Sequence, residues 1–206
     1  MESVKVLGLV NITVLAAGSI FTGSVHEPIK GTKNPQKMLQ TGIPFTKKPV
    51  ALQFDYKVKM SDRENRIRAT GFSKITDVPG KDYPAAILLL QKRWEDANGN
   101  VYAKRIGTMV TYYYHSTDWK NNVTYEIMYG DITNRPEYKA HMMRLQATES
   151  YTVNSKGESV PIHEVAWGDE NDVPTHMYIQ FTSSHGGAYI GSPGNTLWVD
   201  NVKLVY

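Results

Sequence analysis

Apolar and polar residues alternate with a period of two along most of this chain. Residues 54–60 read Phe-Asp-Tyr-Lys-Val-Lys-Met, the pattern of a strand with one buried face. Residues 85–94 contain the run Ile-Leu-Leu-Leu, which is typical of a strand covered on both faces. Further strand-like runs cover residues 108–115, 123–129, 177–182 and 197–206. Many short strands separated by turn residues predict an all-β fold, a jelly roll or β-sandwich of antiparallel strands.

Two local signals refine this prediction. Asn98-Gly99 follows the apolar strand and indicates a hairpin, because a type I′ turn needs positive φ at both central positions. In residues 136–145, Tyr138, Met142 and Leu145 fall on one face of a helix, so this segment is predicted to be a short helix or one more strand. No break in composition divides the chain, and we expect residues 1–206 to form a single domain.

Composition and charge exclude several classes of protein. The chain has no cysteine, which excludes a disulfide-stapled scaffold and Cys-ligated zinc or iron–sulfur centres. Its hydrophobic content of 41% is enough to fill a core. The 23 Lys and Arg against 20 Asp and Glu leave a net charge of +3. These charges are spread along the chain rather than gathered in one patch, so we expect no nucleic-acid partner.

The longest apolar stretch covers residues 4–17. Lys5, Asn11 and Thr13 interrupt it, and it is shorter than the roughly 20 apolar residues that span a bilayer. We therefore expect a β-strand there and no transmembrane segment. Residues 15–18, Leu-Ala-Ala-Gly, resemble a lipoprotein processing box, but Ser19 stands where the lipidated cysteine would be. We expect a form of the protein from which an export signal was removed.

Two stretches carry a resemblance to a known family. The first is Ala16-Ala17-Gly18-Ser19-Ile20-Phe21-Thr22-Gly23, followed by Gly42-Ile43-Pro44-Phe45-Thr46 and by Lys48-Pro49-Val50-Ala51-Leu52 with Asp55-Tyr56-Lys57. The second is Ser183-Ser184-x-Gly186-x-x-Tyr189-x-Gly191-x-x-Gly194-x-x-Leu197-x-Val199-Asp200-x-Val202-x-Leu204-x-Tyr206. Together they resemble the putative carbohydrate metabolism domain (PCMD) family of Bacteroides-type bacteria.

This resemblance covers residues 16–206, strongly at both ends and loosely through residues 60–175. It implies a jelly roll like those of galactose-binding domains and a carbohydrate-handling role. It also implies an exported protein of the periplasm or outer-membrane surface, anchored by a lipid upstream of this chain. The shared glycines and prolines have a structural reading of their own, because they set tight connections and the entrance to a strand.

Aromatic side chains are the first candidates for a binding site, because sugars pack their C–H faces on electron-rich rings. Tyr112 and Tyr114 share one face of a predicted strand, with Tyr113 on the other. Trp119 follows in a turn-rich loop, and Trp94 ends the strand before the hairpin. We predict carbohydrate contacts from Trp94, Tyr112, Tyr114 and Trp119. The alternative is ordinary packing, which we expect for Trp198 and Tyr206 in the last strand.

Carboxylates are the second group of candidates. A glycosidase needs two of them, about 5–5.5 Å or about 6.5–9.5 Å apart. The candidates are Glu95, Asp96, Glu126, Asp131, Glu164, Asp169, Glu170 and Asp172. Glu126, between Tyr125 and Ile127 within a predicted strand, has the best setting for a raised pKa and is the candidate catalytic residue.

Metal binding has weaker signals. The loop at residues 169–172 reads as a solvated turn, with calcium as the alternative. Asp200 occupies a place where related jelly rolls hold structural calcium, so calcium stays open as a structural ion. The six histidines show no helical metal-ligand spacing, and we predict no metal centre.

These observations lead to one main hypothesis and two alternatives. The main hypothesis is a non-catalytic carbohydrate-binding module whose partner is a glycan held by aromatic stacking. The first alternative is a glycoside hydrolase or lyase with a carboxylate acid/base pair. The second is an adhesion or assembly domain that binds another protein through an exposed sheet face.

Overall fold

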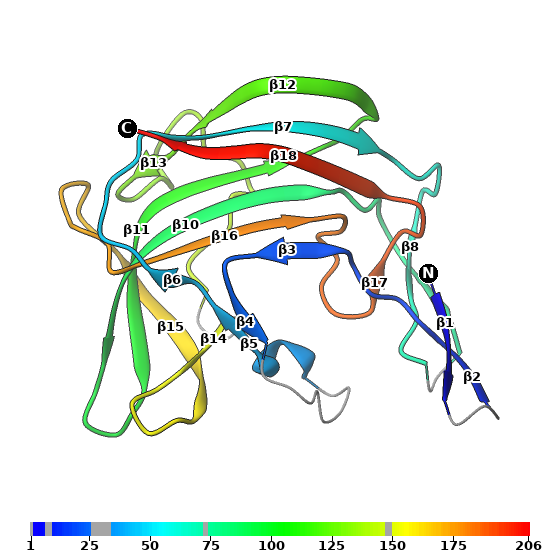
Figure 1. Cartoon of the computed structure of the whole chain (residues 1–206), viewed down its shortest axis with the longest axis horizontal. Coiled ribbons are helices and arrows are strands. Elements are labelled where there is room, and N and C mark those ends of the chain that lie inside the picture. Colours follow the sequence, from blue (N-terminus) through cyan, green and yellow to red (C-terminus); the bar gives the residue numbers. More distant parts are fainter. Residues whose placement is uncertain (1, 7–9, 26–33, 72–73, 147–149) are drawn as a thin grey trace.

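The computed structural model describes residues 2–6, 10–25, 34–71, 74–146 and 150–206. Within these ranges the chain is built from strands, and the helical element is one 3₁₀ turn, η1 (Pro35–Met38). The expected all-β fold is confirmed: two sheets pack face to face, with the shorter sheet lying over the middle of a long curved one (Figure 1). The prediction that residues 1–206 form a single domain stays a prediction.

The long sheet, called the main sheet here, contains eight strands in one path. Their order is β3 (Ser19–Phe21), β16 (His176–Thr182), β10 (Ala85–Glu95), β11 (Val101–Tyr112), β15 (Ser159–Trp167), β14 (Tyr151–Val153), β5 (Leu39–Thr41) and β4 (Gly23–Val25). β6 (Ile43–Pro44) also pairs with β16, and β13 (Met128–Tyr129) with β11. The pairs β11–β15 and β14–β5 are parallel, so the sheet is mixed rather than wholly antiparallel.

The shorter sheet, called the outer sheet here, has β7 (Ala51–Lys59) at its centre. β12 (Thr117–Glu126) and β18 (Thr196–Val205) flank it, both antiparallel to it. The alternation predicted for residues 54–60 is correct, because Phe54 and Val58 are buried in the core between the sheets. That core also takes Leu88 and Phe181 from the main sheet, and Phe54 and Phe181 meet edge to face at 4.9 Å.

Two bulges in the outer sheet explain part of the sequence signature. The register shifts next to Asn122 in β12 and Asn201 in β18, and both residues have φ of 52°, a conformation that Asn tolerates better than most residues. Both donate to the same carboxylate: the Asn122 N–H lies 2.5 Å and the Asn201 amide 2.7 Å from Asp55 in β7. These hydrogen bonds lower the pKa of Asp55. Asp55 and Asn201 therefore tie the two signature segments together.

Smaller sheets complete the fold. One has the order β17 (Ile190–Gly191), β8 (Arg66–Arg68) and β9 (Thr76–Val78). The expected strand over residues 4–17 is instead an antiparallel pair, β1 (Glu2–Val6) and β2 (Val10–Val14).

The hairpin at Asn98-Gly99 forms, but with a different turn. Gly99 has φ of 91°, and it is the only residue of this turn with positive φ. The Asp96 carboxylate accepts the N–H groups of Asn98 and Asn100, both at 2.9 Å. Asp96 therefore holds a longer loop than a type I′ turn would give.

The segment 136–145 forms neither a helix nor a strand but a series of turns. Its backbone is used in tertiary contacts instead, since the Met143 carbonyl accepts a hydrogen bond from Arg105 at 3.2 Å. Met142 and Met143 pack on Ile87, Leu89 and Val110 of the main sheet. A helix of ten residues has little stability of its own and depends on tertiary packing. In this protein the tertiary contacts of the segment favour the irregular path instead.

The face of the main sheet that points away from the outer sheet is called the concave face. The sheet curls toward this side, so that β5 and β4 return beneath β16 and β3 (Figure 1). The register places Ala85, Ile87 and Leu89 of β10 on it, opposite Tyr112, Val110 and Thr108 of β11. On the other side of β10 the same face carries Thr182, Gln180 and Tyr178 of β16.

Candidate functional site

Five aromatic and imidazole rings gather at one end of the concave face. This Tyr/His cluster consists of Tyr83, Tyr112, Tyr114, His141 and His185. The Tyr112 ring has His141 stacked on it at 4.6 Å, and the tilted ring of His185 lies 4.8 Å away. Tyr83 stacks on His185 at 5.5 Å and meets the edge of Tyr114 at 4.7 Å. The cluster therefore forms one continuous surface of rings.

The strand pairing brings these rings together. Ala85 begins β10 and pairs with Tyr112 at the end of β11 and with Thr182 at the end of β16. Tyr83 comes shortly before Ala85 in the chain, and His185 comes shortly after Thr182. Both therefore lie at the same end of the sheet. His141 comes from the turns that cover the concave face, and its Nδ1 lies 3.2 Å from the Tyr114 hydroxyl.

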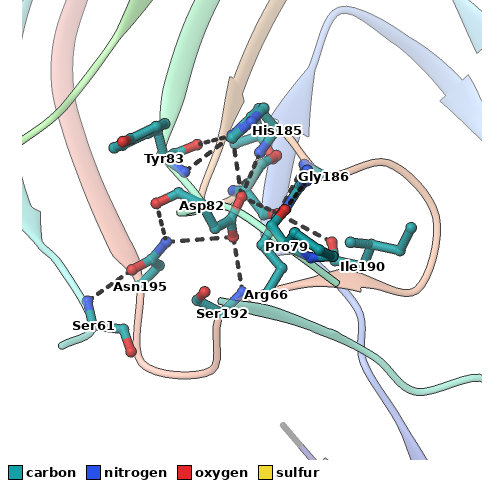
Figure 2. Close-up of polar contacts among 12 residues, drawn as sticks. Ser61, Arg66, Pro79, Asp82, Tyr83, His185, Gly186, Ile190, Ser192 and Asn195 are labelled. Carbon is teal, nitrogen blue, oxygen red and sulfur yellow. Dashed lines mark hydrogen bonds and ion pairs between the residues drawn. The ribbon is translucent and has the colours of Figure 1, made fainter. Parts of the chain in front are cut away.

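A buried carboxylate holds His185 in place. Asp82 is 2% exposed, and its Oδ1 accepts hydrogen bonds from the Ser184 hydroxyl at 2.9 Å and the His185 N–H at 3.2 Å. Its Oδ2 accepts the Ser192 N–H at 2.9 Å. The His185 Nδ1 lies 3.2 Å from Oδ1 and 3.0 Å from the Tyr83 N–H (Figure 2). Asp82 thus fixes the loop that carries the ring.

Asp82 also explains the glycine spacing near the C-terminus. A Cβ at Gly191 would lie 2.8 Å from the Ser184 hydroxyl and 3.1 Å from the Asp82 carboxylate. A Cβ at Gly186 would lie 2.5 Å from the Ile190 carbonyl. Gly191 is needed because its backbone lies too close to Ser184 and Asp82 for a side chain, and Gly186 because its backbone lies too close to the Ile190 carbonyl.

The electrostatics of the cluster favour an uncharged His141 ring. Burial and the nearby Lys139 lower the pKa of His141, so it is neutral at neutral pH. Burial by itself raises the pKa of Asp82, but hydrogen bonds from His185, Ser184 and Ser192 outweigh it and leave that pKa below its ordinary value. Asp82 is therefore ionised, and its negative charge is compensated by donors of the loop.

The concave face continues beyond the cluster with more aromatic surface. Phe21 of β3 lies on this face opposite Gln180, and its ring centroid is 6.5 Å from that of Tyr178. Phe21, Tyr178 and Gln180 are all partly exposed. The face therefore presents two groups of rings with an amide side chain in the same row.

The far end of the concave face is a buried polar network. Glu164 of β15 makes a bidentate ion pair with Arg105, whose side chain is fully buried. Glu164 also accepts from Gln91 at 2.5 Å and from the Gln146 N–H at 2.7 Å. Arg93 donates to Gln91 at 2.8 Å, and burial lowers its pKa to about 10. This network braces three strands, and its carboxylate has all its acceptor positions in use.

The four predicted sugar-contacting residues do not form one site. Tyr112 and Tyr114 lie together in the Tyr/His cluster, and Tyr114 is 48% exposed. Trp94 stacks on Tyr102 at 5.9 Å, on the opposite face of β10 and at the opposite end. Trp119 lies on β12 in the outer sheet and is 47% exposed.

Trp198 and Tyr206, which were expected in the core, are exposed instead. Trp198 is 40% exposed, and Tyr206 is 64% exposed. In β18 the inward positions belong to Leu197 and Val199, which pack on the core. Because side chains alternate along a strand, Trp198 points outward.

The candidate carboxylates take several roles. Glu126 is exposed in the last position of β12. Glu95 accepts hydrogen bonds from Ser155 at 2.6 and 2.9 Å. Asp172 pairs with Lys92 at 2.7 Å and closes the turn that starts at Asp169, in agreement with a solvated turn. The catalytic role of Glu126 stays a prediction.

The sequence interpretation missed Tyr83, His141, His185 and Asp82. His185 lies inside the glycine-spaced signature, and that position was a signal that could have been used. Tyr83 and His141 come from segments without any motif. The strand order brings Tyr83 to Tyr112, and the packing of the turns on the main sheet brings His141 there.

Metal binding receives no candidate from the described residues, which contain no group of three or more His, Cys, Asp or Glu side chains suited to hold an ion. Asp200 pairs across the strands with Asp55, whose two carboxylate oxygens accept from Asn122 and Asn201. Structural calcium at Asp200 stays a prediction. In the described part of the chain, no helix is long and apolar enough to cross a membrane.

A mixed β-sandwich with rings at one end of its concave face defines the general class, a β-sandwich domain. The chain belongs to the "Putative carbohydrate metabolism domain" (PCMD) family, whose model matches residues 2–205. The expected family is therefore confirmed, and the chain is a carbohydrate-related domain. No curated protein matches it.

Solved structures show the same fold. A putative glycoside hydrolase from Bacteroides thetaiotaomicron VPI-5482 is 20% identical, with a TM-score of 0.53 over 93% of this chain and 47% of that chain. Another from Bacteroides vulgatus ATCC 8482 is 15% identical, with a TM-score of 0.51 over 92% of this chain and 64% of that chain. The chain thus spans about half to two thirds of the length of these structures, and at this identity the similarity concerns the fold.

Proposed function

We propose that this domain binds a glycan on its concave face and that the Tyr/His cluster is the main contact. The observation that carries the proposal is the continuous surface formed by Tyr83, Tyr112, Tyr114, His141 and His185. Family membership supports a carbohydrate as the ligand. The proposal replaces the four-residue site expected from the sequence with one that keeps Tyr112 and Tyr114.

The chemistry of the cluster suits a neutral sugar. Rings of Tyr and His offer flat apolar faces for C–H groups, and their hydroxyl and ring N–H groups offer hydrogen bonds at the edges. Tyr114 is the most exposed ring of the cluster, at 48%. Its hydroxyl is already oriented by His141 at 3.2 Å. Rigid, preoriented side chains lose little entropy when they bind.

The buried carboxylates support binding rather than hydrolysis by a carboxylate pair. Asp82 lies beside the Tyr/His cluster, and Glu164 lies at the far end of the concave face. Both carboxylates are buried and fully hydrogen-bonded. A glycosidase acid has to reach the glycosidic oxygen and exchange its proton there. Neither carboxylate meets this requirement, so we propose a non-catalytic module.

One observation favours a second candidate, a glycan-cleaving enzyme. The Tyr114 hydroxyl and the neutral His141 ring lie within hydrogen-bond reach, and such a pair is able to transfer a proton. Release of new sugar ends during prolonged incubation, abolished by Tyr114→Phe, would establish this activity. No release from glycans that bind would leave the binding module as the function.

A glycan array tests the proposal directly. We expect the domain to bind at least one neutral oligosaccharide or polysaccharide, and Tyr114→Ala to lose that signal. Val165→Ala is a matched control, because Val165 is 53% exposed on β15, outside the Tyr/His cluster. Silence of the folded wild-type domain across a broad set of glycans would overturn the proposal.

A further inference from the structure

A hollow lies on the outer sheet, away from the concave face. It has a volume of about 410 Å³ and is lined by Lys57, Val58, Lys59, Ser116, Thr117, Asp118 and Trp198. It sits where β7 ends and β12 and β18 begin, at the right-hand end of the outer sheet in Figure 1. This group of residues is called the outer hollow.

The outer hollow combines a ring with positive charge. Trp198 is 40% exposed, and the Lys57 ammonium lies 5.7 Å from the centroid of its ring. Within the described part of the chain, neither Lys57 nor Lys59 forms an ion pair. The lining contains two lysines and one acidic residue, Asp118, which leaves a positive balance.

Hydroxyl groups complete the lining. The Thr117 hydroxyl accepts the Val58 N–H at 3.2 Å, and the Ser116 hydroxyl accepts the Met60 N–H at 2.9 Å. A hydroxyl that accepts a hydrogen bond still has its own hydrogen to donate. Both hydroxyls are therefore held in place as donors toward an oxygen-rich ligand.

We propose that the outer hollow binds an acidic sugar unit, a residue that carries a carboxylate or a sulfate ester. The sugar ring packs on Trp198, its anionic group lies between Lys57 and Lys59, and Ser116 and Thr117 donate to its oxygens. This site is separate from the concave face, since β7 and the core between the sheets lie between them. The domain thereby has two glycan-contacting surfaces, one for neutral and one for acidic sugars.

The experiment compares tetragalacturonate, a sulfated tetrasaccharide and a neutral tetrasaccharide of equal length. The readout is the NMR signal of the Trp198 indole N–H, assigned with Trp198→Phe, together with the dissociation constant at low and high salt. We expect an acidic ligand to shift this signal and to bind about tenfold more tightly than the neutral one at low salt, with the preference shrinking as salt rises. The two acidic ligands distinguish carboxylate from sulfate recognition.

Variants separate the contributions. Lys57→Gln with Lys59→Gln is expected to remove the preference for the acidic ligand, whereas Lys203→Gln, an exposed lysine elsewhere on β18, keeps it. Trp198→Ala is expected to weaken acidic binding about tenfold, with an unchanged thermal midpoint as the folding control. A Trp198 signal that no ligand shifts, a preference that survives in the double lysine variant, or equally tight binding of inorganic phosphate would overturn the proposal.

Tyr114→Ala keeps this test distinct from the test of the concave face. In that background we expect acidic binding at Trp198 to persist while neutral binding is lost. If neutral glycans fail to bind the wild type but the acidic one shifts Trp198, the proposed function fails and the outer hollow stands. If Tyr114→Ala abolishes both, the outer hollow is not a separate site.

Discussion

The Asp82 carboxylate lies 3.2 Å from Nδ1 of His185, a residue 103 positions later in the chain. Asp82 precedes β10, and His185 follows β16, so this contact joins the two connections at one end of the main sheet. The His185 ring then lies against Tyr83 and Tyr112. The buried carboxylate therefore couples the stability of the C-terminal loop to the shape of the proposed glycan site.

Asp82→Asn should lower both stability and glycan affinity. The Asn side chain has one acceptor oxygen, so at least one donor of Ser184, His185 and Ser192 is left without its partner inside the fold. We expect the free energy of unfolding to fall by about 2–4 kcal/mol, measured by urea denaturation. Asp77→Asn is the control, because Asp77 is exposed and its pair with Arg63 spans 3.9 Å; it should change stability by less than about 0.5 kcal/mol. Equal effects of the two substitutions would contradict the role of Asp82.

His176 should make stability depend on pH between 4 and 6.5. Burial, and then the nearby Arg93, lower its pKa from 6.5 to about 4. In this window the unfolded chain binds a proton that the folded state does not, so stability rises with pH and is lost on acidification from 6.5 to 4. Because the ring is only half-buried, the loss should be on the order of 1–2 kcal/mol.

His176→Gln tests this pH dependence. The free energy of unfolding of the variant, measured from pH 7 to pH 4, should fall less steeply than that of the wild type. His115→Gln, at an exposed position, should follow the wild-type curve. Parallel curves for the wild type and His176→Gln would show that His176 does not carry the effect.

Replacing one member of the buried Arg105–Glu164 pair should lower the free energy of unfolding more than replacing both. Glu164→Gln leaves the Arg105 guanidinium buried without its carboxylate, which should cost about 3–5 kcal/mol. Arg105→Met combined with Glu164→Leu removes both charges and should recover part of this loss. Chemical denaturation of Arg105→Met, Glu164→Leu and the double variant measures the coupling. Additive losses would contradict a direct interaction.

Much of the fold was accessible from the sequence because strands with one buried face have a clear period. The alternation at residues 54–60 and the apolar run at 87–90 correspond to β7 and β10, since Phe54, Val58 and Leu88 fill the same core. The hairpin after β10 was also predicted, although its turn differs from the expected type I′. The path of segment 136–145 was not predicted, because its packing on the main sheet and the hydrogen bond from Arg105 to its Met143 carbonyl depend on strands distant in sequence.

Only part of the candidate site could be predicted from the sequence. Tyr112 and Tyr114 share a strand face by simple alternation, so their proximity followed from the sequence. Tyr83 and His185 join them because β16 pairs with β10, and no local pattern encodes that order. Trp94 was grouped with Tyr112 on residue type, but it faces the other side of the same strand. The position of Trp198 in the last strand favours the core, but alternation with the inward Leu197 and Val199 turns it outward.

The most direct test of the account is glycan affinity of the Tyr/His cluster, measured by isothermal titration calorimetry with a neutral glycan selected on the array. Tyr112→Ala and Tyr114→Ala are compared with Trp94→Ala, a substitution of a ring on the opposite face that is 42% exposed, against 48% for Tyr114. We predict at least about tenfold weaker binding for each tyrosine variant, with thermal midpoints confirming that they fold, and wild-type affinity for Trp94→Ala. Unchanged affinity in both tyrosine variants, or a loss confined to Trp94→Ala, would contradict a binding site on the concave face.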